Sequence, residues 1–161
     1  MTVIAVTGHI RLTEASLPLV REALRETLAP YAGDLTGVSC LAAGADSLFA
    51  EVVLELGGRL VAVVPSRDYR SAVVTPEHAG TFDRLVEAAD DVTVLDRPVA
   101  DAAAYEAANQ EMLRRAERLV AVWDGAPPGG QGGGTADAVL TARAGGLPVD
   151  VVWPEGAARG A

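Results

Sequence analysis

The chain has 161 residues, of which 50% are hydrophobic, and this is typical of one globular domain with its own apolar core. Its formal net charge is −9, from 22 acidic and 13 basic residues, whereas a surface that binds nucleic-acid or lipid phosphates needs clustered basic side chains. We therefore expect a cytoplasmic domain whose partners include neither nucleic acid nor a membrane.

Cysteine, histidine and lysine supply little chemistry in this chain. A single cysteine forms no intramolecular disulfide, and two distant histidines show no metal-ligand spacing, so we expect no metal site. All 13 basic residues are arginines, which excludes a P-loop lysine and a Schiff-base lysine. We expect no bound cofactor.

Short, almost entirely apolar runs recur along the chain and are typical of parallel strands covered on both faces. They cover residues 3–7, 37–41, 60–64, 92–95, 119–123 and 149–153. Amphipathic stretches lie between them, as in right-handed strand–helix–strand crossovers. The helices are expected to begin behind a Thr13 cap, after Asp46, at Pro76, at Asp101 and at Thr135. Glycine pairs at 57–58 and 145–146 predict the ends of the second and fifth helices.

This alternation predicts an α/β fold, a three-layer, Rossmann-like, doubly wound and mainly parallel sheet. We expect residues 1–154 to form one nucleotide-binding domain and residues 155–161 to be a frayed C-terminal tail. Ligands of such folds bind outside the carboxyl ends of the strands, where the strand order reverses. The residues that follow the strands are therefore the candidates for a binding site.

A run of glycines follows the fifth strand and opens the last helix. Gly132, Gly133 and Gly134 allow backbone N–H groups to approach an anion closely, and the helix N-terminus at Thr135 adds a favourable dipole. Thr135 either caps that helix or donates its hydroxyl to a phosphate oxygen. We expect a phosphate-binding loop. The alternative is a flexible linker, because two prolines precede the glycines.

Residues after the first, second and fifth strands are further ligand-binding candidates. They are Gly8, His9, Arg11, Ser39, Gly44, Asp46, Asp124 and Gly125. His9 and Arg11 suit a phosphate as a donor and a bidentate clamp, or are a polar loop residue and a surface charge. Asp46 caps the second helix or contacts a ribose hydroxyl. Asp124 orients a ligand or braces the glycine loop.

The fourth helix offers two more candidates. Tyr105 and Asn109 lie one turn apart, so both can line one wall of a site. Tyr105 is suited to stack on a base, and a core or interface role is the alternative. His78 and Cys40 are interpreted as structural.

Residues 119–148 resemble a Rossmann-like superfamily that groups the LOG phosphoribohydrolases with the DprA (Smf) proteins and is called the SLOG type. The resemblance lies in the segment GQGGGTADAVLTARAGGLP. The LOG signature is Pro-Gly-Gly-x-Gly-Thr-x-x-Glu. Residues 39–46 resemble the DprA pattern Ser-Gly-Leu-Ala-x-Gly-Ile-Asp. The resemblance implies a nucleotide-binding Rossmann-like fold and a homodimer that pairs through helices flanking the site.

The chain departs from the LOG signature at its acid. Ala138 stands where the LOG glutamate acts on the glycosidic bond, and Asp137 is one helical step, about 100°, away and expected to point elsewhere. We therefore expect binding of a nucleotide or related phosphorylated small molecule, with catalytic residues unknown. The alternative is an N-glycosidic bond hydrolase or transferase, LOG-like or deoxyribosyltransferase-like, with a relocated acid such as Asp46, Asp124 or Asp137. A third interpretation makes the glycine loop a protein interface.

Overall fold

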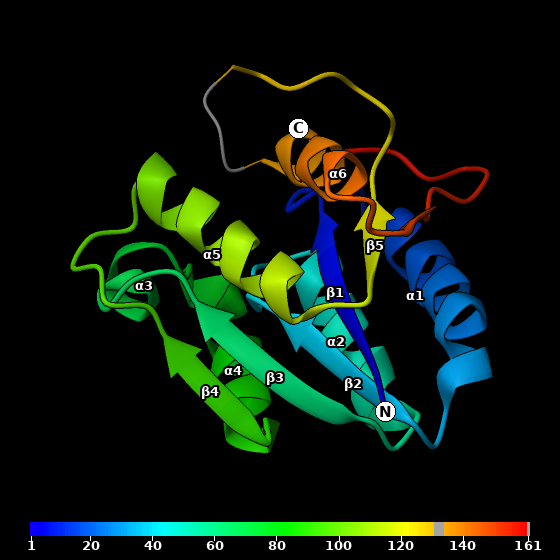
Figure 1. Ribbon diagram of the computed structural model, residues 1–161, viewed down its shortest axis with the longest axis horizontal. Coiled ribbons are helices and arrows are strands. Elements are labelled where there is room, and N and C mark those ends of the chain that lie inside the picture. The colour runs from blue at the N-terminus through cyan, green and yellow to red at the C-terminus, as the bar shows by residue number, and fades with distance from the viewer. Residues whose placement is uncertain (131–133, 161) are drawn as a thin grey trace.

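The computed structural model describes residues 1–130 and 134–160, and a six-stranded sheet runs through its centre (Figure 1). The strands are β1 (Thr2–Gly8), β2 (Leu35–Ser39), β3 (Arg59–Val64), β4 (Asp91–Val94), β5 (Arg118–Val122) and β6 (Val149–Val151). Their order is β4-β3-β2-β1-β5-β6, and each neighbouring pair is parallel. The predicted α/β class is confirmed.

Helices cover both faces of the sheet, which makes three layers. They are α1 (Ser16–Leu28), the 3-10 helix η1 (Ala29–Tyr31), α2 (Ala45–Glu55), α3 (Tyr69–Ala72), α4 (Pro76–Ala88), α5 (Ala102–Arg115) and α6 (Thr135–Ala144). α1, α2 and α4 pack on one face, and α5 and α6 pack on the other. Among the described residues, no helix combines the length and the apolar character that a bilayer crossing requires.

The sequence of β1 explains why this strand lies at the centre of the sheet. Ile4 and Val6 pack with α1 and α2, whereas Ala5 between them packs with α5 and α6. All three side chains are at most 1% exposed. A strand covered on both faces has no solvent side, so residues 3–6 of β1 are all apolar.

The strand order reverses at β1. From β1 the chain moves outward through β2, β3 and β4, and it then returns to place β5 on the other side of β1. The carboxyl ends of β1 and β5 therefore border a crevice, which is where ligands bind in open α/β sheets.

Two helix starts differ from the sequence prediction. Ala15 takes the N-cap position of α1, and the Thr13 hydroxyl instead lies 2.6 Å from Ser16 Oγ. Gly44 takes the N-cap position of α2, so that Asp46 lies within the first turn and does not cap the helix. The short α3 and η1 were not predicted, because so few residues carry no helical periodicity.

Residues 158–160 of the C-terminal segment are hydrogen-bonded to the start of the α1 region. Ser16 Oγ accepts a hydrogen bond from Ala158 N at 2.8 Å, and Thr13 N donates to Ala158 O at 3.0 Å. Gly160 N donates to Arg11 O at 2.9 Å. These bonds hold residues 158–160 against the start of α1. No local sequence pattern predicts hydrogen bonds between residues so far apart in the chain.

Candidate functional site

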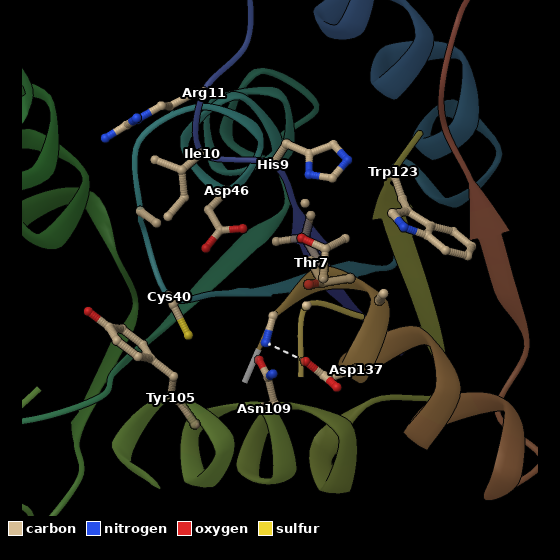
Figure 2. Close-up of a pocket in the computed structure, with 18 of the residues that line it drawn as sticks. Thr7, His9, Ile10, Arg11, Cys40, Asp46, Tyr105, Asn109, Trp123 and Asp137 are labelled. Carbon is tan, nitrogen blue, oxygen red and sulfur yellow. Dashed lines mark hydrogen bonds between the residues drawn. The ribbon is translucent and has the colours of Figure 1, made fainter. Parts of the chain in front are cut away.

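A cavity of about 790 Å³ opens at the carboxyl ends of β1 and β5 (Figure 2). Its walls come from the loop after β1, the turn before α2, α5, the start of α6 and the C-terminal segment. The sequence-predicted residues that line it are Gly8, His9, Arg11, Asp46, Tyr105, Asn109, Gly134 and Thr135.

Four of the predicted site residues within the described ranges do not line the cavity. They are Ser39, Gly44, Asp124 and Gly125. Two more, Gly132 and Gly133, lie outside the described residues, so the phosphate-binding loop stays a prediction there.

Two glycines allow close backbone packing around the cavity. A Cβ on Gly8 would lie 2.4 Å from Ala45 Cβ and 2.8 Å from Val122 Cβ. Gly44 has a φ of +78°, and a Cβ there would lie 2.4 Å from the carbonyl oxygen of Ile10. Packing and loop geometry therefore account for both glycines. Gly8 also borders the cavity.

Ser39 is fully buried and shapes the turn that leads into α2. Its Oγ donates to the carbonyl oxygen of Asp46 at 3.0 Å and accepts from Leu41 N at 3.0 Å. Leu41 has a φ of +59°, which is rare for a residue with a side chain and needs such support. The Ser39 hydroxyl thus serves the backbone of the turn.

His9 lies on the cavity wall and is held by the loop after β5. Its Nε2 accepts a hydrogen bond from Asp124 N at 3.1 Å, and its ring lies edge-on to Trp153 with centroids 5.6 Å apart. Burial and the charge of Arg159 lower the pKa of His9, and Asp124 only partly opposes them. Nε2 also lies 3.1 Å from Oδ1 of Asp124. Both contacts hold His9 against the loop after β5, and together with the lowered pKa of His9 they favour a brace between two loops over a cationic clamp for phosphate.

Asp124 organises the loop after β5. Its Oδ1 accepts a hydrogen bond from Ala126 N at 2.9 Å, and this bond lowers the pKa of Asp124. Its Oδ2 lies 3.7 Å from Nη1 of Arg159. The next residue, Gly125, turns the chain with a φ of +87°. Of the two roles proposed for Asp124, the geometry favours bracing.

Asp46, in the first turn of α2, faces the cavity (Figure 2). Its side chain is buried, and this burial raises the pKa of Asp46 to about 7, opposed only by a hydrogen bond with the backbone of Ala42. The carboxyl group is therefore divided between its protonated and ionised forms near neutral pH. A strongly perturbed acid in a cavity is typical of functional sites.

The N-terminus of α6 lies across the cavity from Asp46 (Figure 2). Gly134 takes the N-cap position, so Thr135 is the first helical residue and not the cap. Oδ2 of Asp137 accepts a hydrogen bond from Gly134 N at 3.1 Å. Asp137 lines both the cavity and a smaller pocket of about 180 Å³ between α5 and α6, whereas Ala138 is buried and borders only the smaller pocket. The expectation that Asp137 points away from the site is wrong, because α6 presents position 137 to the cavity.

α5 supplies a largely apolar wall. Tyr105 and Asn109 lie on this wall, one helical turn apart. Tyr105 meets Tyr69 edge-on, with ring centroids 6.5 Å apart, and Met112 Sδ lies 3.5 Å from Cys40 Sγ. Aromatic and sulfur-containing side chains next to one amide suit contact with a flat heterocycle.

Two arginines lie at the edge of the cavity. Arg11 follows β1, and Arg159 comes from the C-terminal segment. An antiparallel bridge pairs Leu12 with Arg159 and keeps the two stretches together. Sequence reasoning missed Arg159, because the hydrogen bonds that hold its segment join residues far apart in the chain. In residues 1–130 and 134–160, no group of three or more His, Cys, Asp or Glu side chains is placed to hold a metal ion.

Comparison with known proteins places the fold. No family model and no curated protein sequence matches this chain. DprA from Streptococcus pneumoniae matches with a TM-score of 0.65 and 16% identity, over 94% of this chain and 50% of that one. The chain has the Rossmann-like fold of DprA. It spans half the length of that protein.

Two more structures share this DprA-like fold. DprA from Helicobacter pylori matches with a TM-score of 0.65 and 18% identity, over 93% of this chain and 64% of that chain. The molybdenum cofactor carrier protein from Chlamydomonas reinhardtii matches with a TM-score of 0.58 and 21% identity, over 93% of this chain and 75% of that chain. The predicted resemblance is confirmed at the level of fold.

The DprA-like fold corrects the expectation that charge excludes nucleic acid. The Helicobacter pylori DprA, which has this fold, binds single-stranded DNA. Net charge is a sum over the whole chain and says nothing about where basic side chains cluster on the surface. A net charge of −9 therefore does not exclude a nucleic-acid partner. The expectation of no nucleic-acid partner was wrong, and the expected homodimer stays a prediction.

Proposed function

We propose that the cavity binds a nucleotide or a related phosphorylated small molecule. The observation that carries this proposal is that a single cavity joins a helix N-terminus and two arginines to an aromatic, apolar wall. Its volume of about 790 Å³ suits such a ligand, because small-molecule pockets span about 300–1,000 Å³. Two proteins of the same fold give support, since one carries the molybdenum cofactor and the other binds single-stranded DNA.

The start of α6 and the side chain of Arg159 hold the anionic group. Backbone N–H groups at a helix N-terminus lack partners within the helix, and the helix dipole favours negative charge. Thr135 offers a backbone N–H and a hydroxyl at this end of a ten-residue helix. The 3.7 Å from Arg159 to Asp124 is too long for a strong hydrogen bond, so the guanidinium can turn to a phosphate and bind it in a bidentate manner.

Isothermal titration calorimetry of the purified chain with AMP, GMP, inorganic phosphate and a short single-stranded oligonucleotide tests the proposal. Arg159→Ala should weaken mononucleotide binding about 10- to 100-fold, the value of a charge-assisted hydrogen bond. Arg114→Ala is the matched control, because Arg114 is exposed, pairs with Glu111 and is absent from the cavity lining. It should leave affinity unchanged.

Two outcomes contradict this assignment. Binding of the oligonucleotide without any mononucleotide binding would replace it with a nucleic-acid partner. Equal affinities for Arg159→Ala and Arg114→Ala would remove the anion-binding role of Arg159.

The competing function is cleavage of an N-glycosidic bond in a nucleotide, with Asp137 as the relocated acid. One observation favours it: Asp137 lines the cavity beside Thr135. Chromatographic detection of free base after incubation with AMP or GMP distinguishes this reaction from binding alone.

A further inference from the structure

Asp46 is a buried acid without a cation. The residue is 8% exposed, and among the described residues no positive charge contributes to its pKa. Ser39 bonds to the backbone oxygen of Asp46 and not to its carboxyl group. Its near neighbours include Cys40 and Tyr69, whose pKa values are raised by burial and, to a smaller extent, by Asp46, and neither offers a positive charge.

The carboxyl group of Asp46 opens onto the cavity. It points into the space between Thr7 and Cys40 (Figure 2). Among the described residues, no side-chain nitrogen or oxygen that is fully buried lacks a hydrogen-bond partner, so an acceptor position of Asp46 that has no partner is open to the cavity. Ionised carboxylates accept at about four lone-pair positions, and the backbone of Ala42 accounts for one hydrogen bond. The remaining acceptor positions are available to a ligand.

Helix stability does not explain this acid. An aspartate in the first turn of a helix gains from the helix dipole. Here burial outweighs that gain, because the pKa of Asp46 is raised and not lowered. An exposed acid in the first turn would stabilise α2 without this cost, whereas the carboxyl group of Asp46 lies on the wall of the cavity.

The wall next to Asp46 defines the shape of the group that it receives. Tyr105 and Met112 on α5 and Cys40 after β2 line the same cavity. A flat heterocycle against this wall presents its edge to the carboxylate. Two adjacent N–H donors match the two oxygens of a carboxylate, as in the ring N–H and 2-amino group of guanine. Adenine has an acceptor next to its amino group and lacks this pair of donors.

We propose that Asp46 accepts a bidentate pair of hydrogen bonds from the base of the ligand, so that the cavity selects a 2-amino-oxo purine of the guanine type. This selectivity rests on the proposed nucleotide binding and names the class of base. Asp46 is its specificity-determining residue, and the anionic group is held separately by Arg159 and the start of α6.

Calorimetric titration at pH 8 with GMP, IMP and AMP tests the selectivity, because IMP is GMP without the 2-amino group. The wild-type chain should bind GMP about 10- to 100-fold more tightly than IMP, the value of a hydrogen bond to a charged group. Asp46→Asn should abolish this preference, because one amide oxygen cannot replace the two carboxylate oxygens, and GMP should lose more affinity than IMP, which offers only the ring N–H. Asp83→Asn, an exposed acid paired with Arg70, should keep the preference.

The outcomes separate the two proposals. Equal binding of GMP and IMP, or a preference that persists in Asp46→Asn, overturns the role of Asp46 and leaves nucleotide binding in place. Failure of all three nucleotides to bind overturns both. A preference that disappears only in Asp46→Asn supports the proposed selectivity.

Discussion

Nε2 of His9 lies 3.1 Å from the backbone nitrogen of Asp124, and this hydrogen bond joins the loop after β1 to the loop after β5. The two strands are neighbours at the point where the strand order reverses, so the bond spans the crevice that becomes the cavity. Arg159 lies beside the same pair. The wall of the cavity therefore includes a histidine whose pKa is held below its usual value by burial and by Arg159.

His9→Ala should destabilise the chain by about 2 kcal/mol at pH 8, because it removes this hydrogen bond and the contact with Trp153. The folded-state pKa of His9 is lowered from its usual 6.5, so the contribution of His9 is present above that pH and is lost as the pH falls below it. The cost of the substitution should therefore shrink between pH 8 and pH 5. Urea unfolding of both proteins at both pH values measures it, and a cost that grows toward pH 5 would contradict a neutral His9.

Asp46→Asn should stabilise the fold by about 2–4 kcal/mol at pH 8. The pKa of Asp46 is raised from 3.8 to about 7 in the folded state, so the wild type loses stability as the pH rises through this interval and loses no more above it. The gain should thus be larger at pH 8 than at pH 5 in chemical denaturation. Asp83→Asn breaks a surface ion pair and should give no gain. A gain independent of pH would show that Asp46 is not the titrating group.

Three glycine-to-alanine substitutions separate backbone clash from backbone strain. Gly44→Ala should cost more than about 3 kcal/mol, since its Cβ meets the carbonyl oxygens of Ile10 and His9 at 2.4 and 2.6 Å. Gly125→Ala has a similar positive φ with nothing within 4 Å and should cost about 1 kcal/mol. Gly80→Ala, in the open on α4, should stabilise by about 0.5–1 kcal/mol. Melting temperatures rank the three, and equal losses at Gly44 and Gly125 would refute the clash.

Apolar runs were sufficient to predict the central strands, because burial on both faces leaves an apolar run in the sequence, and the edge strand β4 was predicted although it is largely exposed. The run at 60–64 became Arg59–Val64, and the run at 119–123 became Arg118–Val122. The last strand ends earlier than expected, at Val151. Short elements such as α3 depend on tertiary packing, here the contact of Tyr69 with Phe82, and have no periodic signal.

The site was predicted in position more than in detail. The rule that ligands bind after the strands identified Gly8, His9 and Asp46 among the lining residues. It could not separate a lining residue from a brace, because the hydrogen-bond partner of His9 is 115 residues away in the chain. Arg159 was missed for the same reason. The rotation of about 100° per helical residue also gave the wrong orientation for Asp137, because the cavity extends to that face of α6.

Ser16→Ala tests whether the C-terminal segment supports the site. The Ser16 hydroxyl bonds both the N–H and the carbonyl oxygen of Ala158, next to Arg159. Its loss should cost about 1–3 kcal/mol and should weaken AMP binding several-fold, although Ser16 does not line the cavity. Thr27→Ala removes a hydroxyl that donates to the carbonyl oxygen of Ala23 within α1, and it should leave affinity unchanged. Unchanged AMP affinity in Ser16→Ala would contradict the support of Arg159 by this segment.

The wild-type chain should release no free base from AMP or GMP. Hydrolysis of a glycosidic bond uses a carboxylate against the sugar to stabilise an oxocarbenium-like transition state, and a second acid to protonate the leaving group. Ala138, which the sequence resemblance aligns with the LOG glutamate, carries no such group and borders only the smaller pocket. Asp137 borders the large cavity, but its Oδ2 is bonded to Gly134 N and stabilises the start of α6.

Chromatography of nucleotide incubated with the chain should therefore show no more base than buffer alone. Asp137→Asn should lower stability by about 0.5–2 kcal/mol through loss of the charged N-terminal contact, and it should leave the absence of release unchanged. The opposite result is equally specific. The wild type would then release base, Asp137→Asn would abolish this release and Arg114→Ala would preserve it. That result would identify Asp137 as the acid that replaces the LOG glutamate. A merely structural loss at the start of α6 would reduce nucleotide affinity as well. Calorimetry on Asp137→Asn makes that distinction, because retained affinity without turnover assigns the chemistry to its carboxylate.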